Sequence, residues 1–527
     1  MRMVRGLARC GFGGLLALSL LASPVAAQQG VPQRSPAAVK FTVQAFDIEG
    51  ENPLGEGAQA ALKPFLGEHS GLDGLVAAAD ALEGTLAGAG YAFHRVSLPP
   101  QSLTGGRVKL QIVNFKVGKI EVKGQQHFSE DNIRASLPGL ESGQTPEPLD
   151  LALQLRAANE HPNKKIQTAF KESDTPATVD VDLKVQDSRP WNAYALLANT
   201  GSSQTGSTRI TLGASHANLW DRDHALTLTY TTAPGRYDKV KQIGVNYAVP
   251  VYSEAAKVSV LYSKSTVNSG KVADLFDVAG QGVVKGLRVD KKLPSPDTAY
   301  AHGLQFSVDD KFFNNDVTFA GVPIVPDVRS RPWGLRYDGE YRTPEAQFNF
   351  HADYFRNIRS GRLNDDVSYA ASRGGARSDW ESVKYGASLN YNLDDGWLLR
   401  GLLEGQWAHD PLIGGEQISA GGESRGRGYD AGVIAGDSGR YYSLELWVPP
   451  FEGGWRFLGF LDGGRVSVED PVAGQNRTES IASAGAGLRW SYGQHLSLRA
   501  DYGKAMQAAG ANPKGHQMVH FNVMLRY

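Results

Sequence analysis

The chain has 527 residues, of which 54 are lysine or arginine and 55 are aspartate or glutamate, so its formal net charge is −1. This balance argues against a nucleic-acid partner, and the length predicts more than one domain. Glycine is abundant at 61 residues, and tyrosine and phenylalanine contribute 20 each, which favours β structure with many turns.

Residues 1–27 have the pattern of an export signal. Three arginines are followed by the apolar run GFGGLLALSLLA and by small residues before Gln28. This order is typical of a secretory signal peptide cleaved after Ala27, and the apolar run is too short to anchor the chain across a bilayer. The only cysteine, Cys10, would leave with the signal, so disulfides and cysteine metal sites are excluded from the mature chain. The twelve histidines lack metal-ligand spacing, and we expect no metal and no cofactor.

A short linker at residues 28–40 precedes two predicted modules. The linker contains two prolines and no helical face, so no plug helix is expected there. The pattern FDIEG at 46–50 recurs as IEVKG at 120–124, which indicates a duplicated unit. We therefore expect two small α+β modules, at 41–115 and 116–188, each large enough for a modest core.

Each module is predicted to hold a helix between its strands. In the first module, one helical face carries Leu75, Val76, Ala79, Leu82 and Leu86. In the second module, the corresponding face carries Leu149, Leu151 and Leu155. Alternating segments at 108–112 and 179–185 then read as half-buried strands.

From Trp191 to the end, apolar and polar residues alternate in one segment after another. Examples are QFNFHADY at 347–354, HLSLRADY at 495–502 and the last segment, which ends at Tyr527. A soluble sandwich would alternate in the same way, so the connections decide between the two folds. We count sixteen candidate strands whose loops are alternately short and long, which is typical of a transmembrane barrel. The predicted fold is mainly β: a sixteen-stranded transmembrane β-barrel over 190–527, preceded by two small periplasmic α+β modules.

A glycine-rich stretch between the eleventh and twelfth predicted strands matches two hydrolase motifs. Residues 422–426 fit G-x-S-x-G, and residues 436–439 repeat the G-D-S-G of serine proteases. A nucleophile elbow requires a helix directly after its serine, and a protease serine requires histidine and acid partners. Neither Ser424 nor Ser438 has this context, so we expect no catalytic residue and no enzymatic activity.

The same stretch resembles a motif of a membrane-protein family. Gly426-Arg427-Gly428-Tyr429 is similar to the (V/I)-R-G-(Y/F) loop motif of barrel transporters that carry periplasmic POTRA modules, although Gly426 replaces the usual Val or Ile. The segment FLDGG at 460–464 is similar to their F-x-D-x-G strand motif. Two POTRA-like modules before a sixteen-stranded barrel resemble the two-partner secretion transporters (the TpsB branch, or haemolysin secretion/activation proteins). The resemblance extends over essentially the whole mature chain.

The strand motif provides a candidate partner for the loop arginine. Alternation puts Phe460, Asp462 and Gly464 on one face of their strand. If this face lines the lumen, Arg427 can form a bidentate ion pair with Asp462, and Gly464 leaves room for the loop tip. The resemblance implies the same pair, as an anchor that holds the loop inside the barrel. The alternative is an ordinary surface loop and a solvated lumen acid.

Three functions fit these expectations. As the resemblance implies, the POTRA modules would capture an unfolded exoprotein, a large adhesin- or haemolysin-type (TpsA-like) partner, and secrete it through the barrel. The sequence has no Walker pattern, so we expect no nucleotide hydrolysis. The second candidate is a factor that inserts other barrels into the outer membrane. The third, a passive porin, leaves the periplasmic modules unexplained.

The expected location is the outer membrane of a Gram-negative cell, with the POTRA modules in the periplasm. The barrel would contact outer-membrane lipid and function as a monomer. Polar residues would line its lumen, for example His351, Asp353, Arg499 and Asp501. Most histidines, such as His495 and His520, are expected on strand faces, as lumen or interface residues.

Overall fold

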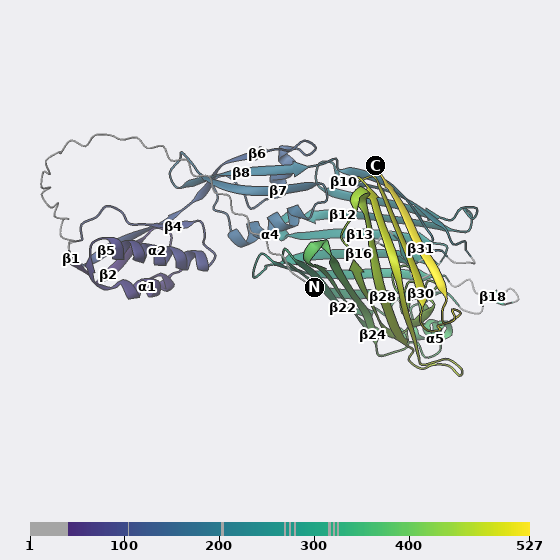
Figure 1. Cartoon of the computed structure of the whole chain (residues 1–527). Helices are drawn as coiled ribbons and strands as arrows, with labels where there is room; N and C mark the ends of the chain where they lie inside the picture. Colours follow the sequence, from purple (N-terminus) through teal and green to yellow (C-terminus); the bar gives the residue numbers. More distant parts are fainter. Residues whose placement is uncertain are drawn as a thin grey trace, which may run out of the picture.

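In the computed structural model, two small α+β modules precede a large closed barrel (Figure 1). The structure describes residues 40–103, 105–201, 205–267, 281–314 and 326–527, together with the backbone of four short loop strands: β14 (Gly270–Val272), β15 (Phe276–Val278), β18 (Thr318–Phe319) and β19 (Val322–Pro323). The predicted signal peptide and all of the predicted linker except Lys40 lie outside the described residues.

The first module packs helices against a three-stranded sheet. Its elements are β1 (Lys40–Val43), β2 (Ala45–Glu49), α1 (Glu56–Leu62), η1 (Lys63–Phe65), β3 (Gly67–Ser70), α2 (Asp73–Gly88), β4 (His94–Ser97) and β5 (Arg107–Asn114). The central β5 pairs parallel with β2 and antiparallel with β4, while β1 pairs with β3. Four of the five predicted apolar residues of α2 are buried, but Val76 is 49% exposed because it lies beside the core-facing stripe.

The second module repeats this arrangement with a smaller set of elements: β6 (Lys116–Lys123), α3 (Glu130–Ala135), α4 (Pro148–Asn159), β7 (Lys164–Glu172) and β8 (Thr178–Asp187). The central β8 pairs parallel with β6 and antiparallel with β7. Leu151 is buried as predicted, whereas Leu149 is exposed in the first turn of α4.

The duplicated sequence pattern marks the same place in both modules. Its apolar residues lie on β2 and β6, each an edge strand parallel to the central strand. The closing glycines, Gly50 and Gly124, have φ of 93° and 95°. A Cβ on them would lie 2.2 Å from the carbonyl oxygen of Ile112 and 2.4 Å from that of Val185, respectively. Both positions therefore require glycine for the same two reasons, conformation and space.

The barrel is closed by pairing of its last strand with its first. Its strands are β9 (Trp191–Ala198), β10 (Arg209–Leu219), β11 (His224–Thr232), β12 (Lys241–Val251), β13 (Ala256–Ser265), β16 (Gly282–Leu293), β17 (Tyr300–Phe313), β20 (Val328–Ser330), β21 (Pro332–Arg342), β22 (Ala346–Asn357), β23 (Glu381–Asn392), β24 (Leu398–Ala408), β27 (Ser438–Trp447), β28 (Trp455–Ser467), β29 (Thr478–Tyr492), β30 (Leu496–Ala505) and β31 (Gln517–Arg526). Because β20 and β21 both pair with β17 and are separated by one residue, they form one strand of the wall. The predicted sixteen-stranded barrel is confirmed.

Alternation along each strand separates the two faces of the wall. On β28, Leu461 is 54% exposed, whereas its neighbour Asp462, on the opposite face, is 4% exposed. Exposed apolar side chains cover the outside, and buried polar side chains such as Asp353 and Asp501 face the lumen. Among the described residues, no helix has the length and apolar character needed to cross a bilayer.

The remaining short elements lie in the connections. The end of the barrel near the second module has short turns, three of which contain a 3₁₀ turn: η2 (Tyr252–Glu254), η3 (Asp394–Gly396) and η5 (Glu452–Gly454). The opposite end carries the long loops and the helix α5 (Asp366–Ser372), which the sequence did not predict (Figure 1). The long loop between β24 and β27 contains η4 (Gly414–Glu416), β25 (Ile418–Ala420) and β26 (Ile434–Gly436).

Candidate functional site in the barrel lumen

The loop between β24 and β27, residues 409–437, folds back into the barrel. β25 and β26 pair with each other within this loop. The tetrapeptide at 426–429 is buried, and Tyr429 is 0% exposed. Loop and wall share one apolar cluster, made of Ile418, Ala420, Tyr429, Ile434, Val466, Ile481, Ala505 and Ala509. The loop is therefore packed as part of the barrel interior.

Arg427 contacts Asp462 through its side chain and its backbone. Its Nε and Nη2 donate to the two carboxylate oxygens at 2.9 and 2.8 Å, and its backbone N–H donates to Oδ2 at 3.1 Å. Its Nη1 donates to Glu445 Oε1 at 2.7 Å, and Nη2 also donates to Ser443 Oγ at 3.0 Å. Asp501 Oδ1 is 3.8 Å from Nη1. Three carboxylates from the wall thus surround one guanidinium.

Phe460 covers the same guanidinium from one side. The central carbon of the Arg427 guanidinium lies 3.5 Å from the centroid of the Phe460 ring, a cation–π contact. Gly485, opposite Phe460 on β29, leaves space for the ring, because a Cβ there would lie 2.4 Å from its Cζ. At Gly464, a Cβ would meet Ile481 Cγ1 at 3.3 Å, so that position is tight but not closed.

The glycine after the arginine lies close to the backbone of the barrel wall. Gly428 has φ of 92°, and a Cβ on it would lie 2.8 Å from the carbonyl carbon of Gly503 on β30. Its N–H donates to His520 Nε2 at 3.3 Å. The next residue, Tyr429, donates its hydroxyl proton to the wall, where the carbonyl oxygen of Ala482 is 2.8 Å away. Gly428 and Tyr429 thus attach the chain directly after Arg427 to the barrel wall.

Every residue of the two predicted motifs lies in this region, but several partners were not predicted. The sequence had predicted Asp501 to line the lumen and His520 to lie on a strand face, but neither as a neighbour of the tetrapeptide at 426–429, and Glu445, Ser443, Gly485 and Gly503 were not singled out. Glu445 and Ser443 alternate on β27 in register with Phe460 and Asp462 on β28. A correct prediction of the register between these two strands would therefore have identified Glu445 and Ser443 as neighbours of Arg427.

The G-D-S-G segment is a structural joint between loops. Asp437 is fully buried and accepts hydrogen bonds from Arg373 and from the backbone N–H of Leu412. The Ser438 hydroxyl lies 3.0 Å from the carbonyl oxygen of Ala408. In the other motif, Ser424 is exposed. Neither serine has a histidine as a hydrogen-bond partner among the described residues.

The second module lies against one end of the barrel (Figure 1), and a second buried charge joins the two. Lys164, on β7, is 1% exposed and pairs with Asp223, in the turn between β10 and β11. Its Nζ also donates to Asn132 Oδ1 and Ser136 Oγ, both at 2.7 Å. Tyr252, in the next turn of the barrel, donates to Asp223 at 2.6 Å. The contact therefore unites one module and two turns.

The buried charged and polar side chains of this junction form hydrogen bonds with one another in place of water. Burial alone would raise the pKa of Asp223, but the contacts with Lys164, Tyr252 and Asn132 hold that pKa below its usual value. Burial lowers the pKa of His161, which favours the neutral ring. Its Nε2 donates to the carbonyl oxygen of Ala217 at 2.8 Å, which adds a further contact between the module and β10.

Comparison with protein families gives two matches. The family described as haemolysin secretion/activation protein ShlB/FhaC/HecB matches residues 178–490. The POTRA domain of the ShlB type matches residues 41–114. The first match covers more than half of the chain, and the second corresponds to the first α+β module.

Similar proteins and structures agree with these matches. The chain is 21% identical to the outer membrane transporter CdiB of Dickeya dadantii over 402 residues, which cover 72% of this chain and 67% of that protein. It is 24% identical to CdiB of Escherichia coli over 483 residues, with 87% and 77% covered. The solved structure of Escherichia coli CdiB has a TM-score of 0.73 at 17% identity, covering 95% of this chain and 93% of that one. With two modules, a closed barrel and these matches, the chain belongs to the ShlB/FhaC/HecB family of haemolysin secretion/activation proteins, the outer-membrane transporters of two-partner secretion.

Proposed function

We propose that this outer-membrane transporter captures one unfolded exoprotein with its POTRA modules and secretes it through the barrel without nucleotide hydrolysis. The partner is a large adhesin- or haemolysin-type protein encoded to be exported with it. The observation that carries the proposal is the loop at 409–437, which lies inside the lumen with Arg427 paired to Asp462. We propose that this pair anchors the loop. Release of this loop would widen the barrel lumen, which the loop narrows while Arg427 is paired with Asp462.

Capture would use the edges of the two small sheets. In the first module β2 and β4 are the outer strands of the three-stranded sheet, and in the second β6 and β7 are. An extended client segment can add to such an edge through main-chain hydrogen bonds, which require little sequence specificity. An unfolded exoprotein meets that requirement, and its folding outside the cell would bias the direction of transport.

The lumen wall suits passage of a chain of mixed sequence. Cross-strand ion pairs line it, such as Arg336–Asp353 with Nε–Oδ1 at 2.5 Å and Arg489–Asp501 with Nη1–Oδ1 at 2.8 Å. Paired charges keep the wall polar but give it no strong net field of one sign. Charged segments of an unfolded client are therefore not strongly attracted to the wall. Because the barrel is closed within one chain by β31 and β9, we propose that the protein functions as a monomer in contact with outer-membrane lipid.

Depletion of the protein from its cell tests this function. We expect one large exoprotein to disappear from the surface and medium, while the amounts of other outer-membrane barrels stay within twofold in quantitative proteomics. The rival function is assembly of other barrels, since the fold is also similar to that of BamA from Haemophilus ducreyi, with a TM-score of 0.50 at 15% identity. A general loss of outer-membrane barrels would support that rival and refute secretion of one partner.

A further inference from the structure

Two arginines lie side by side on the outer face of the barrel. Arg440 on β27 and Arg465 on β28 are cross-strand partners in the register of the two strands. Both are exposed, and both alternate with outward residues such as Leu444 and Leu461. Arg440 follows the long loop at 409–437 by three residues, so the pair lies at the extracellular end of the wall.

The pair is unfavourable unless an anion joins it. Directly opposed residues of neighbouring strands have Cβ atoms about 5 Å apart, and like charges at that separation destabilise the sheet. Neither arginine forms an ion pair among the described residues. Arg356, at the same end and on the same outer face, is by contrast 3.2 Å from Glu381. Carboxylates thus neutralise one outward arginine and leave this pair unneutralised.

Other polar groups extend the cationic patch along the rim. Ser480 on β29 is the cross-strand partner of Arg465, and its exposed hydroxyl can donate to an anion. Lys504 on β30 is exposed on the same face; in the pairing register it is level with Ala484 and Leu461, four positions nearer the membrane centre than Arg465. We call the group formed by Arg440, Arg465, Ser480 and Lys504 the rim patch.

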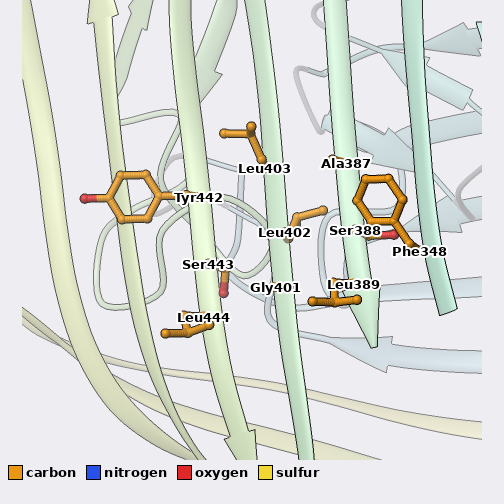
Figure 2. Close-up of a pocket in the computed structure, with 10 residues that line it drawn as sticks. All are labelled: Phe348, Ala387, Ser388, Leu389, Gly401, Leu402, Leu403, Tyr442, Ser443 and Leu444. Carbon is orange, nitrogen blue, oxygen red and sulfur yellow. The ribbon is translucent and has the colours of Figure 1, made fainter. Parts of the chain in front are cut away.

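An apolar hollow on β22, β23, β24 and β27 lies nearer the membrane centre than the rim patch and shares β27 with it. Tyr442, two residues from Arg440 and roughly 7 Å further along the strand, forms one side of the hollow. Figure 2 shows the hollow around Gly401, where a Cβ would meet no atom within 4 Å. Its volume is about 340 Å³. The outward apolar side chains around it are Phe348, Ala387, Leu389, Leu403, Tyr442 and Leu444.

We propose that the rim patch and this hollow bind one phosphorylated lipid of the outer leaflet. Arg440 and Arg465 would donate to a phosphate of the headgroup, because guanidinium groups match phosphate oxygens in geometry and charge. An acyl chain would fill the hollow, which faces the membrane interior. The order of the two features, cationic at the surface and apolar below, matches the order of headgroup and chain in a lipid of that leaflet.

Lipid retention by the purified full-length protein tests the proposal. The detergent-solubilised protein is delipidated and then mixed with diphosphorylated lipid A or with the same lipid after removal of its phosphates. Native mass spectrometry measures the bound fraction. We expect the wild type to retain the phosphorylated form at least tenfold better.

Variants separate the rim patch from general lipid adhesion. In Arg440→Gln/Arg465→Gln we expect that preference to disappear, whereas Arg356→Gln, at an outward arginine that already has a carboxylate partner, keeps it. Arg465→Lys keeps the charge and most of the preference. Heat-modifiable migration on a gel confirms that each variant is folded.

Two results would overturn the proposal. One is equal retention of both lipids by the wild type, which would also be seen if the patch served an acidic partner protein. The other is an unchanged preference in the folded double variant. Both readouts are independent of secretion, so they can fail while the proposed secretion function stands.

Discussion

At the scale of single residues, Arg427 belongs to a balanced network rather than to one ion pair. Asp501 also accepts from Arg489 at 2.8 Å, and Glu445 lies 3.9 Å from Arg400. Arg427 of the loop and five residues of the wall therefore form one network of three cations and three acids: Arg400, Arg427, Arg489, Glu445, Asp462 and Asp501. A buried network of this kind is stable when complete and costly when one member is lost.

We predict that Arg427→Ala releases the loop. The change strands Asp462 without its counter-charge, at a cost of about 3–5 kcal/mol for a buried pair. Limited proteolysis should then cut within 409–437, and conductance of the barrel in planar bilayers should rise. Arg425→Ala is the matched control, because Arg425 pairs with Glu404 where both side chains are 25% exposed. Equal resistance of Arg427→Ala and wild type to protease would show that the ion pair does not hold the loop.

We predict that Gly428→Ala weakens the same loop by a steric route. Its Cβ would lie 2.8 Å from the backbone of Gly503, and its φ of 92° disfavours any side chain. Gly432→Ala is the control, because Gly432 also has a positive φ, 65°, but meets nothing within 4 Å. The midpoint of thermal unfolding in detergent should fall further for Gly428→Ala. If both variants unfold at the same temperature, close packing of Gly428 against the wall does not contribute to the stability of the protein.

At the scale of elements, the junction of the second module and the barrel is more strongly built than a flexible linker would be. Asn132, on α3, donates to Asp223 Oδ1 at 3.0 Å, and Arg156, on α4, donates to the carbonyl oxygen of Leu293 at 3.3 Å and to Ser295 Oγ at 3.0 Å. Two helices and three periplasmic turns therefore meet. Under the proposed function, such a junction would fix the direction from which a captured client reaches the lumen.

We predict that Lys164→Ala loosens this junction. The substitution leaves Asp223 buried without its cation, which costs about 3–5 kcal/mol. Hydrogen exchange should accelerate in the turn at 220–223 and in α3. Lys171→Ala is the control on the same strand, because Lys171 is largely exposed where it pairs with Asp182. Unchanged exchange at 220–223 in Lys164→Ala would contradict this prediction.

At the scale of the whole molecule, the two modules and the long loops lie at opposite ends of the barrel. The modules lie at the end of the barrel with short turns, and the packed loops lie at the other end (Figure 1). Near that far end, Arg373 donates to the buried Asp437, 2.8 Å away, and to the carbonyl oxygen of Glu469. Three long loops are thereby tied together, so a client leaving the barrel would have to displace them.

We predict that deletion of residues 116–187 abolishes secretion while the barrel still inserts. Lys164→Ala leaves the Asp223 carboxylate buried without a cation, which destabilises the protein. The deletion avoids this free-energy cost, because removal of the whole module exposes Asp223 to water. Secretion of the exoprotein is measured in the medium, and barrel folding by heat-modifiable migration. Normal secretion by this variant would refute the proposed capture step.

The sequence alone predicted the elements well, because its strongest signals are local. Alternation of apolar and polar residues marks each strand of the wall, and loop lengths distinguish its two ends. FDIEG and IEVKG identified the two modules because the same positive φ and the same lack of space for a Cβ require glycine at the end of both patterns. Local patterns were weaker for helices: Val76 and Leu149 fit a helical face by spacing but are exposed in the structure.

The amino-acid sequence thus determined the barrel, the duplicated modules and the two motifs that supply Arg427 and Asp462. Only the tertiary structure decided that Glu445 and Asp501 share this arginine, that Lys164 is buried against Asp223, and that Arg440 faces Arg465. The physical reason is that alternation reports the face of a residue but not its neighbours. Neighbours depend on strand register and on loops that fold back, and both are set by closure of the whole barrel.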